Sequence, residues 1–169
     1  MKRAIVLFPK FENIDAIQAV RERFDPLASF IAPHITLVFP FESELSTQEI
    51  GDHVRRAIEG VKRFPVQLSS VTGDFRDGYL FLNVKRGNDA IIDLHDKLYR
   101  GVLEQYLFRK VTYCPHVIVG RLEQPTEFDQ ALEELAKFSE QFEAEIDQVY
   151  VENIDSHERS TIELVLDLE

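Results

Sequence analysis

The chain has 169 residues and one cysteine, and 30 acidic against 19 basic side chains give it a formal net charge of −11. This charge disfavours sequence-independent binding along a nucleic-acid duplex, which depends on clustered Lys and Arg that displace counterions. The chain has no long apolar run, no basic-then-apolar leader at its start and no second cysteine for a disulfide, so we expect a cytoplasmic protein without a membrane partner.

The first half of the chain alternates between patterns typical of strands and of helices. One helix pattern ends at Asp25-Pro26, because the residue before a proline avoids the α region. Ser46 and Glu49 have the spacing of a capping box and mark the start of the next helix. The expected elements are a strand at Ala4 to Phe8, a helix through Ile14, Ile17, Val20 and Phe24, a strand at His34 to Phe41, a helix through Ile50, Val54, Ile58 and Val61, and a hairpin of Val66 to Phe75 and Tyr79 to Val84 that turns at Asp77-Gly78.

The second half repeats this order of elements. Thr126 is the expected cap of its last helix, and the final strand alternates apolar and polar residues, which predicts that one face of that strand is buried. The expected elements are a helix through Leu94, Leu98 and Val102, a strand at His116 to Leu122, a helix through Leu132, Leu135 and Phe138, and two closing strands at Ile146 to Ile154 and Ile162 to Leu168.

Two short segments share a pattern of proline, histidine and a mainly β-branched apolar run, at Pro33 to Val38 and Pro115 to Gly120. Histidine titrates near neutral pH, so His34 and His116, brought together by the fold, could supply a base and an acid to one reaction. The repeat predicts an internal duplication with halves at roughly residues 1–78 and 79–169, joined in one bilobal domain that covers the whole chain. In this arrangement His34 and His116 face each other across a central cleft.

Thr36 places a hydroxyl two residues after His34, on the same face of a strand, but the corresponding residue after His116 is Ile118. The pattern of a histidine followed two residues later by Thr or Ser, once in each half, resembles the 2H phosphoesterase superfamily, which includes the 2'-5' RNA ligase and RNA 2',3'-cyclic phosphodiesterase proteins. The opening strand at Ile5 to Pro9 is similar to that of the small bacterial YjcG-like subgroup. The resemblance implies an α+β fold, a bilobal duplicated α/β unit with antiparallel sheets around a central cleft.

The resemblance implies a metal-independent phosphodiesterase, without a cofactor, that opens 2',3'-cyclic phosphates of small nucleotides or short RNA ends. It assigns His34 and His116 as general acid and base, in an order that the sequence leaves open, and Thr36 as a hydrogen-bond donor to the phosphate. Ile118 lacks the second hydroxyl, and the loss of one such donor can raise a barrier by roughly 3 kcal/mol. A backbone N–H or Arg121 could replace it, although strict alternation along the strand would point Arg121 to the opposite face.

A second interpretation keeps the fold and the anion site but not the reaction. In this case the chain is a non-catalytic phosphate- or nucleotide-binding module with a degenerate second motif at Ile118. Three aromatic residues that flank the motifs, Phe39, Phe41 and Tyr113, are candidates for stacking on a nucleobase, although aromatic side chains in strands most often belong to the core. Of these, Tyr113 is the expected substrate-binding residue. The oligomeric state is left open by the sequence.

The remaining histidines and the cysteine carry no metal-binding pattern. His53, His95 and His157 are isolated on predicted helices or a turn, and we expect them to be surface or capping residues. Cys114 lies two residues before His116, and we expect it to be a buried, unreactive thiol. No His/Cys/Asp spacing resembles a zinc site.

Overall fold

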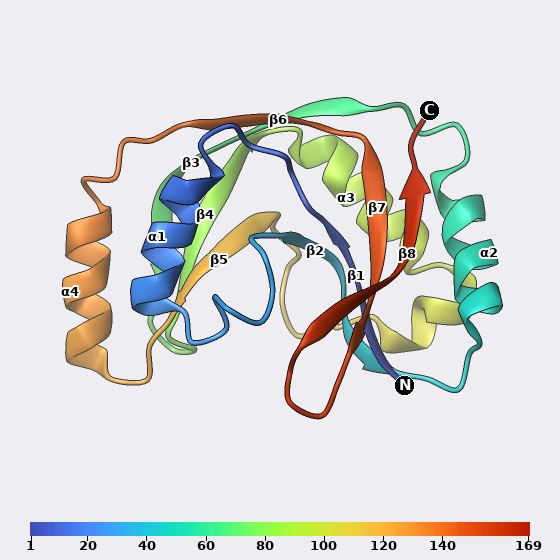
Figure 1. Ribbon diagram of the computed structural model, residues 1–169, viewed down its shortest axis with the longest axis horizontal. Coiled ribbons are helices and arrows are strands. Elements are labelled where there is room, and N and C mark those ends of the chain that lie inside the picture. Colours follow the sequence, from blue (N-terminus) through green and yellow to red (C-terminus); the bar gives the residue numbers. More distant parts are fainter.

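The computed structural model describes residues 1–169 as one curled antiparallel sheet with α-helices at both of its ends (Figure 1). Helices α1 and α4 lie toward one end of the sheet, and α2 and α3 lie toward the other. The elements are β1 Lys2–Leu7, α1 Ile14–Phe24, β2 Ile35–Glu42, α2 Thr47–Ile58, β3 Phe64–Asp74, β4 Tyr79–Arg86, α3 Asn88–Leu98, the 3-10 helix η1 Gly101–Tyr106, β5 His116–Arg121, α4 Pro125–Leu135, β6 Phe142–Ile146, β7 Gln148–Ile154 and β8 Ser160–Asp167.

The strand order β6-β3-β4-β5-β2-β1-β7-β8 places the two motif strands, β2 and β5, at the centre of the sheet. One registered pair, Ile35 with Val117, joins these two strands. Outward from this pair the order is symmetric: β1 and β4 come next, then β7 and β3, then β8 and β6. Strand β3 therefore joins strands from the second half of the sequence. The expected boundary at residues 78 and 79 falls where the β3–β4 hairpin enters β4, inside one half of the sheet.

Several element ends follow from local signals. Ser46 and Glu49 form the expected capping box, α1 ends before Asp25, and Gly78, with φ +69, closes the β3–β4 hairpin. Four expectations are wrong. Helix α2 ends at Ile58 instead of continuing through Val61, and α4 ends at Leu135 instead of continuing through Phe138. Helix α4 begins at Pro125 instead of being capped by Thr126, since a proline at the first helical position loses no hydrogen bond. Helix α3 ends at Leu98 instead of continuing through Val102, because Gly101 turns the chain into η1.

The closing strands also differ from the expectation. The segment expected as one strand from Ile146 to Ile154 is divided at Asp147 between β6, which pairs with β3, and β7, which pairs with β1. In β8 the register against β7 shifts by one residue at Glu163, whose side chain binds buried Arg3 with Nε and Oε2 2.7 Å apart. This bulge interrupts the regular alternation, so Ile162 is 48% exposed rather than buried.

The apolar core packs against one face of the sheet. In β4 the alternating residues Leu80, Leu82 and Val84 belong to it, whereas Tyr79 and Phe81 are half-buried and lie outside it. We call the face of the sheet that carries Tyr79 and Phe81 the motif face. Among the helices, none combines the length and the apolar character that crossing a bilayer requires.

Candidate active site

The two histidine motifs lie side by side on the motif face. His34 directly precedes β2, and His116 is the first residue of β5. Strands β2 and β5 are antiparallel, and Ile35 is registered with Val117. One residue away from this pair on either side, His34 therefore lies opposite Ile118 and Thr36 lies opposite His116. Directly opposed residues project from the same face, with Cβ atoms about 4.5–5.5 Å apart. The structure therefore groups the two histidines, the hydroxyl and the isoleucine as one set.

Strand β4 establishes which face this set occupies. Ile118 pairs with Phe81, and His116 pairs with Asn83, the next residue on the same face of β4. The ring centroids of Phe81 and His116 are 4.3 Å apart. Both histidines are half-buried, so each ring retains contact with solvent on this face.

Each histidine makes the same hydrogen bond to the backbone. Nδ1 of His34 lies 2.9 Å from the carbonyl oxygen of Ala32, and Nδ1 of His116 lies 2.7 Å from that of Cys114. A carbonyl oxygen only accepts, so Nδ1 carries the proton in both neutral rings. Nε2 then has a free lone pair when the ring is neutral and becomes a donor when the ring is protonated. The exposed side chain of Cys114 differs from the buried thiol that we expected.

Arg121 also lies on the motif face, because β5 contains a β-bulge. The register between β4 and β5 shifts by one residue between Ile118 and Gly120, which leaves Val119 without a partner. Beyond the bulge Arg121 pairs with Tyr79, and its guanidinium carbon is 5.9 Å from the ring centroid. The expectation that Arg121 points to the opposite face is therefore wrong, since the extra residue reverses the alternation.

A buried carboxylate holds Arg121 in place. Asp25 forms an ion pair with Arg121 and accepts a second hydrogen bond from Nε of Arg21, at 3.0 Å. Arg21 is 1% exposed and also donates to the carbonyl oxygen of Ile31, at 2.8 Å. We call Arg21, Asp25 and Arg121 the arginine cluster. Its one carboxylate lies between two guanidinium groups, so the cluster has a net positive charge. In the sequence Asp25 indicated only the end of a helix, although its spacing of four residues from Arg21 is the usual spacing of a helical ion pair.

Burial and the arginine cluster both favour neutral imidazoles. Burial is the largest cause that lowers the pKa of His34, to about 4; the Ala32 carbonyl opposes this shift, and the two guanidinium groups of the cluster add to it. Burial also lowers the pKa of His116, and the carbonyl of Cys114 opposes that shift. Both rings are therefore neutral at pH 7, and the cluster acts on His34 but not on His116.

Aromatic rings from other strands flank both histidines. Phe8, just after β1, lies with its ring centroid 6.0 Å from that of His34, and Phe81 contacts His116 as described above. Phe81 is stacked with Tyr79, with ring centroids 6.0 Å apart and planes inclined by 19°. Sequence reasoning missed Phe8 and Phe81 because it considered only aromatic residues close to the motifs along the chain. Their proximity arises from the pairing of strands.

Tyr113 supports the site from behind the sheet. Its ring stacks on His95 at a centroid distance of 3.7 Å, and its hydroxyl donates to the carbonyl oxygen of Thr36 at 2.7 Å. Burial raises the pKa of Tyr113. His95 is itself buried, with Nδ1 2.7 Å from the carbonyl oxygen of Leu37, so the expectation of a surface residue is wrong. Tyr113 thus holds the segment before β5 against β2, and its ring and its hydroxyl both already have partners within the protein.

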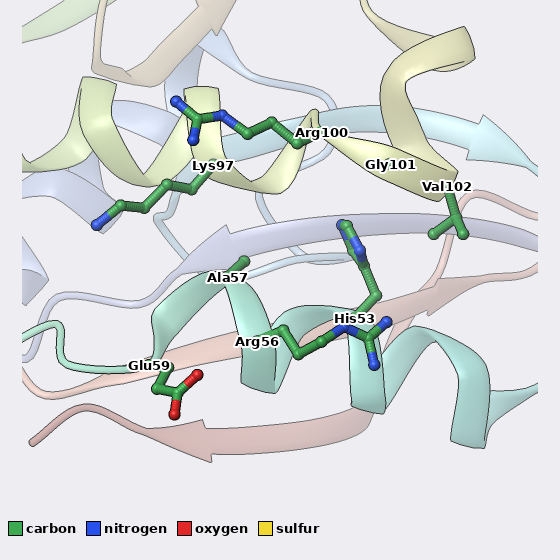
Figure 2. Close-up of a pocket in the computed structure, with 8 residues that line it drawn as sticks. All are labelled: His53, Arg56, Ala57, Glu59, Lys97, Arg100, Gly101 and Val102. Carbon is green, nitrogen blue, oxygen red and sulfur yellow. The ribbon is translucent and has the colours of Figure 1, made fainter.

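A basic hollow of about 400 Å³ lies between α2 and α3, lined by none of the motif residues (Figure 2). Arg56, Lys97 and Arg100 contribute its positive charge, Glu59 contributes one negative charge, and Lys97 is paired with Asp93 at 2.8 Å. These cations lie near the C-terminal ends of both helices, where the helix dipole favours them. His53 in the same hollow is buried, with Nε2 2.8 Å from the carbonyl oxygen of Leu98, the last residue of α3, so of the two roles expected for it, surface or capping residue, it has the capping role. No three His, Cys, Asp or Glu side chains gather in a way that could hold a metal ion.

Comparison with known proteins identifies the family. The model of the 2'-5' RNA ligase superfamily matches residues 9–158. The chain belongs to this superfamily. The resemblance to the 2H phosphoesterases that the two motifs indicated is therefore confirmed.

The matches to relatives and to solved structures extend over most of this chain. A Bacillus licheniformis protein is 28% identical over 152 residues, 89% of each chain, and a Halalkalibacterium halodurans protein is 30% identical over 125 residues, 72% of this chain and 70% of its own. Both are provisionally named phosphoesterases. Escherichia coli LigT in complex with 3'-AMP superposes with a TM-score of 0.66 at 14% identity over 99% of this chain and 97% of its own. The Thermus thermophilus protein TT0787 gives 0.64 at 16% identity over 99% and 98%. These structures confirm the expected α+β fold of the superfamily.

Proposed function

We propose that this protein is a phosphodiesterase that opens 2',3'-cyclic phosphates of nucleotides or short RNA ends, with His34 and His116 as its base and acid. The observation that carries the proposal is the placement of both imidazoles on one face of adjacent strands, each with Nδ1 on a backbone carbonyl and Nε2 available. Membership of the superfamily and the names of the relatives support phosphodiesterase chemistry. The E. coli LigT complex with 3'-AMP supports binding of a small nucleotide.

In the proposed reaction His34 is the base. Its Nε2 takes a proton from a water molecule, whose oxygen attacks phosphorus. His116, protonated on Nε2, gives that proton to the departing ribose oxygen as the P–O bond breaks. The pKa of His34, lowered to about 4 by burial and by the arginine cluster, keeps this ring neutral above that pH, whereas burial alone lowers the pKa of His116 and the arginine cluster does not contribute. After turnover the two rings have exchanged protonation states, and exchange with solvent restores them.

Thr36 and Arg121 are the donors that we assign to the phosphate. The hydroxyl of Thr36 lies opposite His116, and the guanidinium of Arg121 lies farther along β5 on the same face. Arg121 and Tyr79 also border a hollow of about 500 Å³ beside the β3–β4 turn, and the Arg121 side chain is 22% exposed. A guanidinium donates charge-assisted hydrogen bonds to phosphate oxygens. Arg121 thereby compensates for the hydroxyl that Ile118 lacks.

Incubation of the purified protein with the four nucleoside 2',3'-cyclic monophosphates, and with short RNAs that end in a cyclic phosphate, tests this function. We expect a nucleoside or RNA monophosphate as product, and no product with His34→Ala. If the folded wild-type protein turns over none of these substrates but binds them, the non-catalytic binding module is the correct function, an outcome that Ile118 favours.

The plot of kcat/KM against pH should be bell-shaped, with its maximum below pH 7. Below pH 4 His34 becomes protonated and the base is lost, and the pKa of His116, lowered from 6.5, places the loss of the acid below pH 6.5. Measurement of kcat/KM from about pH 3.5 to 8 checks this, because that ratio reports the free enzyme. A kcat/KM that stays level from about pH 6 to 8 would exclude His116 as the acid.

The substitution Ile118→Thr should raise turnover. Both side chains are β-branched, so the strand should accept the threonine at a stability cost of about 1 kcal/mol at this half-buried position. We expect kcat/KM for a cyclic phosphate to rise about tenfold, less than the roughly 10²–10³ of a sole oxyanion donor because Arg121 already acts there. Ile118→Val is the matched control, since it has the shape of threonine without the hydroxyl. Equal rates for the two variants would place the phosphate away from this residue.

A further inference from the structure

The loop between η1 and β5 exposes an apolar and basic tip, Phe108 to Val111. Phe108 is 47% exposed and Val111 is 52% exposed, and neither belongs to the core. Arg109 and Lys110 between them are also exposed. Neither cation forms an ion pair, although acidic residues outnumber basic ones in this chain by 30 to 19. Two unpaired cations therefore lie beside an exposed aromatic ring on a protein with an acidic overall charge.

The fold places this tip beside the candidate active site. Phe108 packs edge to face against Phe39, with ring centroids 6.0 Å apart. Phe39 is half-buried, lies outside the core, and is three residues beyond Thr36 on β2, or about 10 Å along the strand. The other end of the loop is fixed by the hydrogen bond from Tyr113 to Thr36, and the chain then enters β5 at His116.

An exposed ring with adjacent cations is the combination that binds single-stranded nucleic acid, in which bases stack on aromatic side chains and cations follow the phosphates. We propose that the tip docks the nucleotides next to the terminal phosphate, so that the preferred substrate is a single-stranded oligoribonucleotide with a 2',3'-cyclic phosphate end and not a mononucleotide. This inference rests on the proposed function. A duplex fits the tip poorly for two reasons. Its bases are stacked on one another and cannot stack on Phe108, and its closely spaced phosphates are repelled by the acidic residues that predominate in the rest of the protein.

Binding of a fluorescein-labelled hexaribonucleotide with a 3'-phosphate end, followed by anisotropy, tests docking without turnover. We expect Phe108→Ala to weaken hexamer binding at least about fivefold and Phe108→Tyr to bind like wild type, because base stacking on an aromatic ring is sequence-tolerant and strong. Arg109→Gln/Lys110→Gln should reduce the slope of log affinity against log salt by about 1.4, or about 0.7 for each phosphate that is no longer neutralised. The matched control is Lys62→Gln/Arg63→Gln, an adjacent exposed pair of cations beside the C-terminal Glu169, and it should leave the slope unchanged.

The same variants, assayed on a nucleoside 2',3'-cyclic monophosphate and on a hexamer with a cyclic end, separate the two proposals. A loss confined to the hexamer supports docking at the tip. Equal losses on both substrates, hexamer affinities within about twofold of wild type, or an equal loss in the control would each overturn it. If the wild-type protein turns over neither substrate, the proposed function fails, and the anisotropy comparison still decides by the same limits whether the tip binds RNA.

Discussion

His34→Ala and His116→Ala should each reduce kcat for a 2',3'-cyclic phosphate by at least about a hundredfold, since a positioned acid or base contributes roughly 10²–10⁴ in rate. Each imidazole makes one side-chain hydrogen bond, to the backbone carbonyl of the residue just before its own motif, and both rings are half-buried. Removal of either ring should therefore leave the fold intact. Steady-state kinetics with circular dichroism on the same samples measures both effects.

His157→Ala is the matched control for these variants, because His157 is exposed in the turn between β7 and β8 and contacts no motif residue. It should keep wild-type activity. The double variant His34→Ala/His116→Ala should be little slower than either single variant, since groups that act in one step are not additive. A folded single variant that retained more than about a tenth of wild-type turnover would show that its histidine is neither the acid nor the base.

Asp25→Asn should destabilise the protein by about 3–5 kcal/mol, the usual cost of leaving a buried charge without its partner. Asparagine keeps the shape of Asp25 but leaves the buried Arg21 guanidinium and that of Arg121 without a carboxylate. Arg121 would also lose its anchor, so we expect a higher KM for cyclic phosphates at temperatures where the variant remains folded. Urea unfolding of both proteins measures the difference in the free energy of unfolding.

Arg23→Gln, in the last turn of α1, provides the comparison for Asp25→Asn, at the residue that follows this helix. Arg23 pairs with Glu134 at 2.6 Å, but both side chains are more than half exposed, at 56% and 52%. Loss of such a surface pair should cost less than about 1 kcal/mol. If Asp25→Asn proved no more destabilising than Arg23→Gln, the arginine cluster would not hold Arg121 in place.

Elements with local signals could be predicted from the sequence. The capping box at Ser46, the proline after Asp25 and the Asp77-Gly78 turn each specify the backbone through near neighbours, and all three agree with the structure. The two histidine motifs predicted the superfamily because their spacing depends only on the alternation within a strand. The expected arrangement, with the two histidines facing each other across a central cleft, differs from the structure, in which they lie side by side at the adjacent strands β2 and β5 of one sheet.

Features that depend on the register between strands could not be predicted in this way. The bulge at Val119 turns Arg121 toward the motif face. The neighbouring Gly120 is a residue type common at bulges, but a glycine within a strand does not specify which residue is left unpaired. Phe8 and Phe81 reach the histidines from β1 and β4 through strand pairing alone. His95 resembled a surface residue because its acceptor, the carbonyl oxygen of Leu37, is 58 positions away.

The single registered pair between β2 and β5 has a mechanical consequence. Five pairs join β4 to β5 and five join β1 to β2, so the connection between the two four-stranded halves is the least hydrogen-bonded part of the sheet. We call this connection between β2 and β5 the seam. The two imidazoles lie on opposite sides of it, His34 next to β2 and His116 on β5. A rotation of one half against the other about this seam would change the separation of the two imidazoles and leave the distances within each half unchanged, so the axis of easiest bending and the gap that a phosphate must bridge coincide.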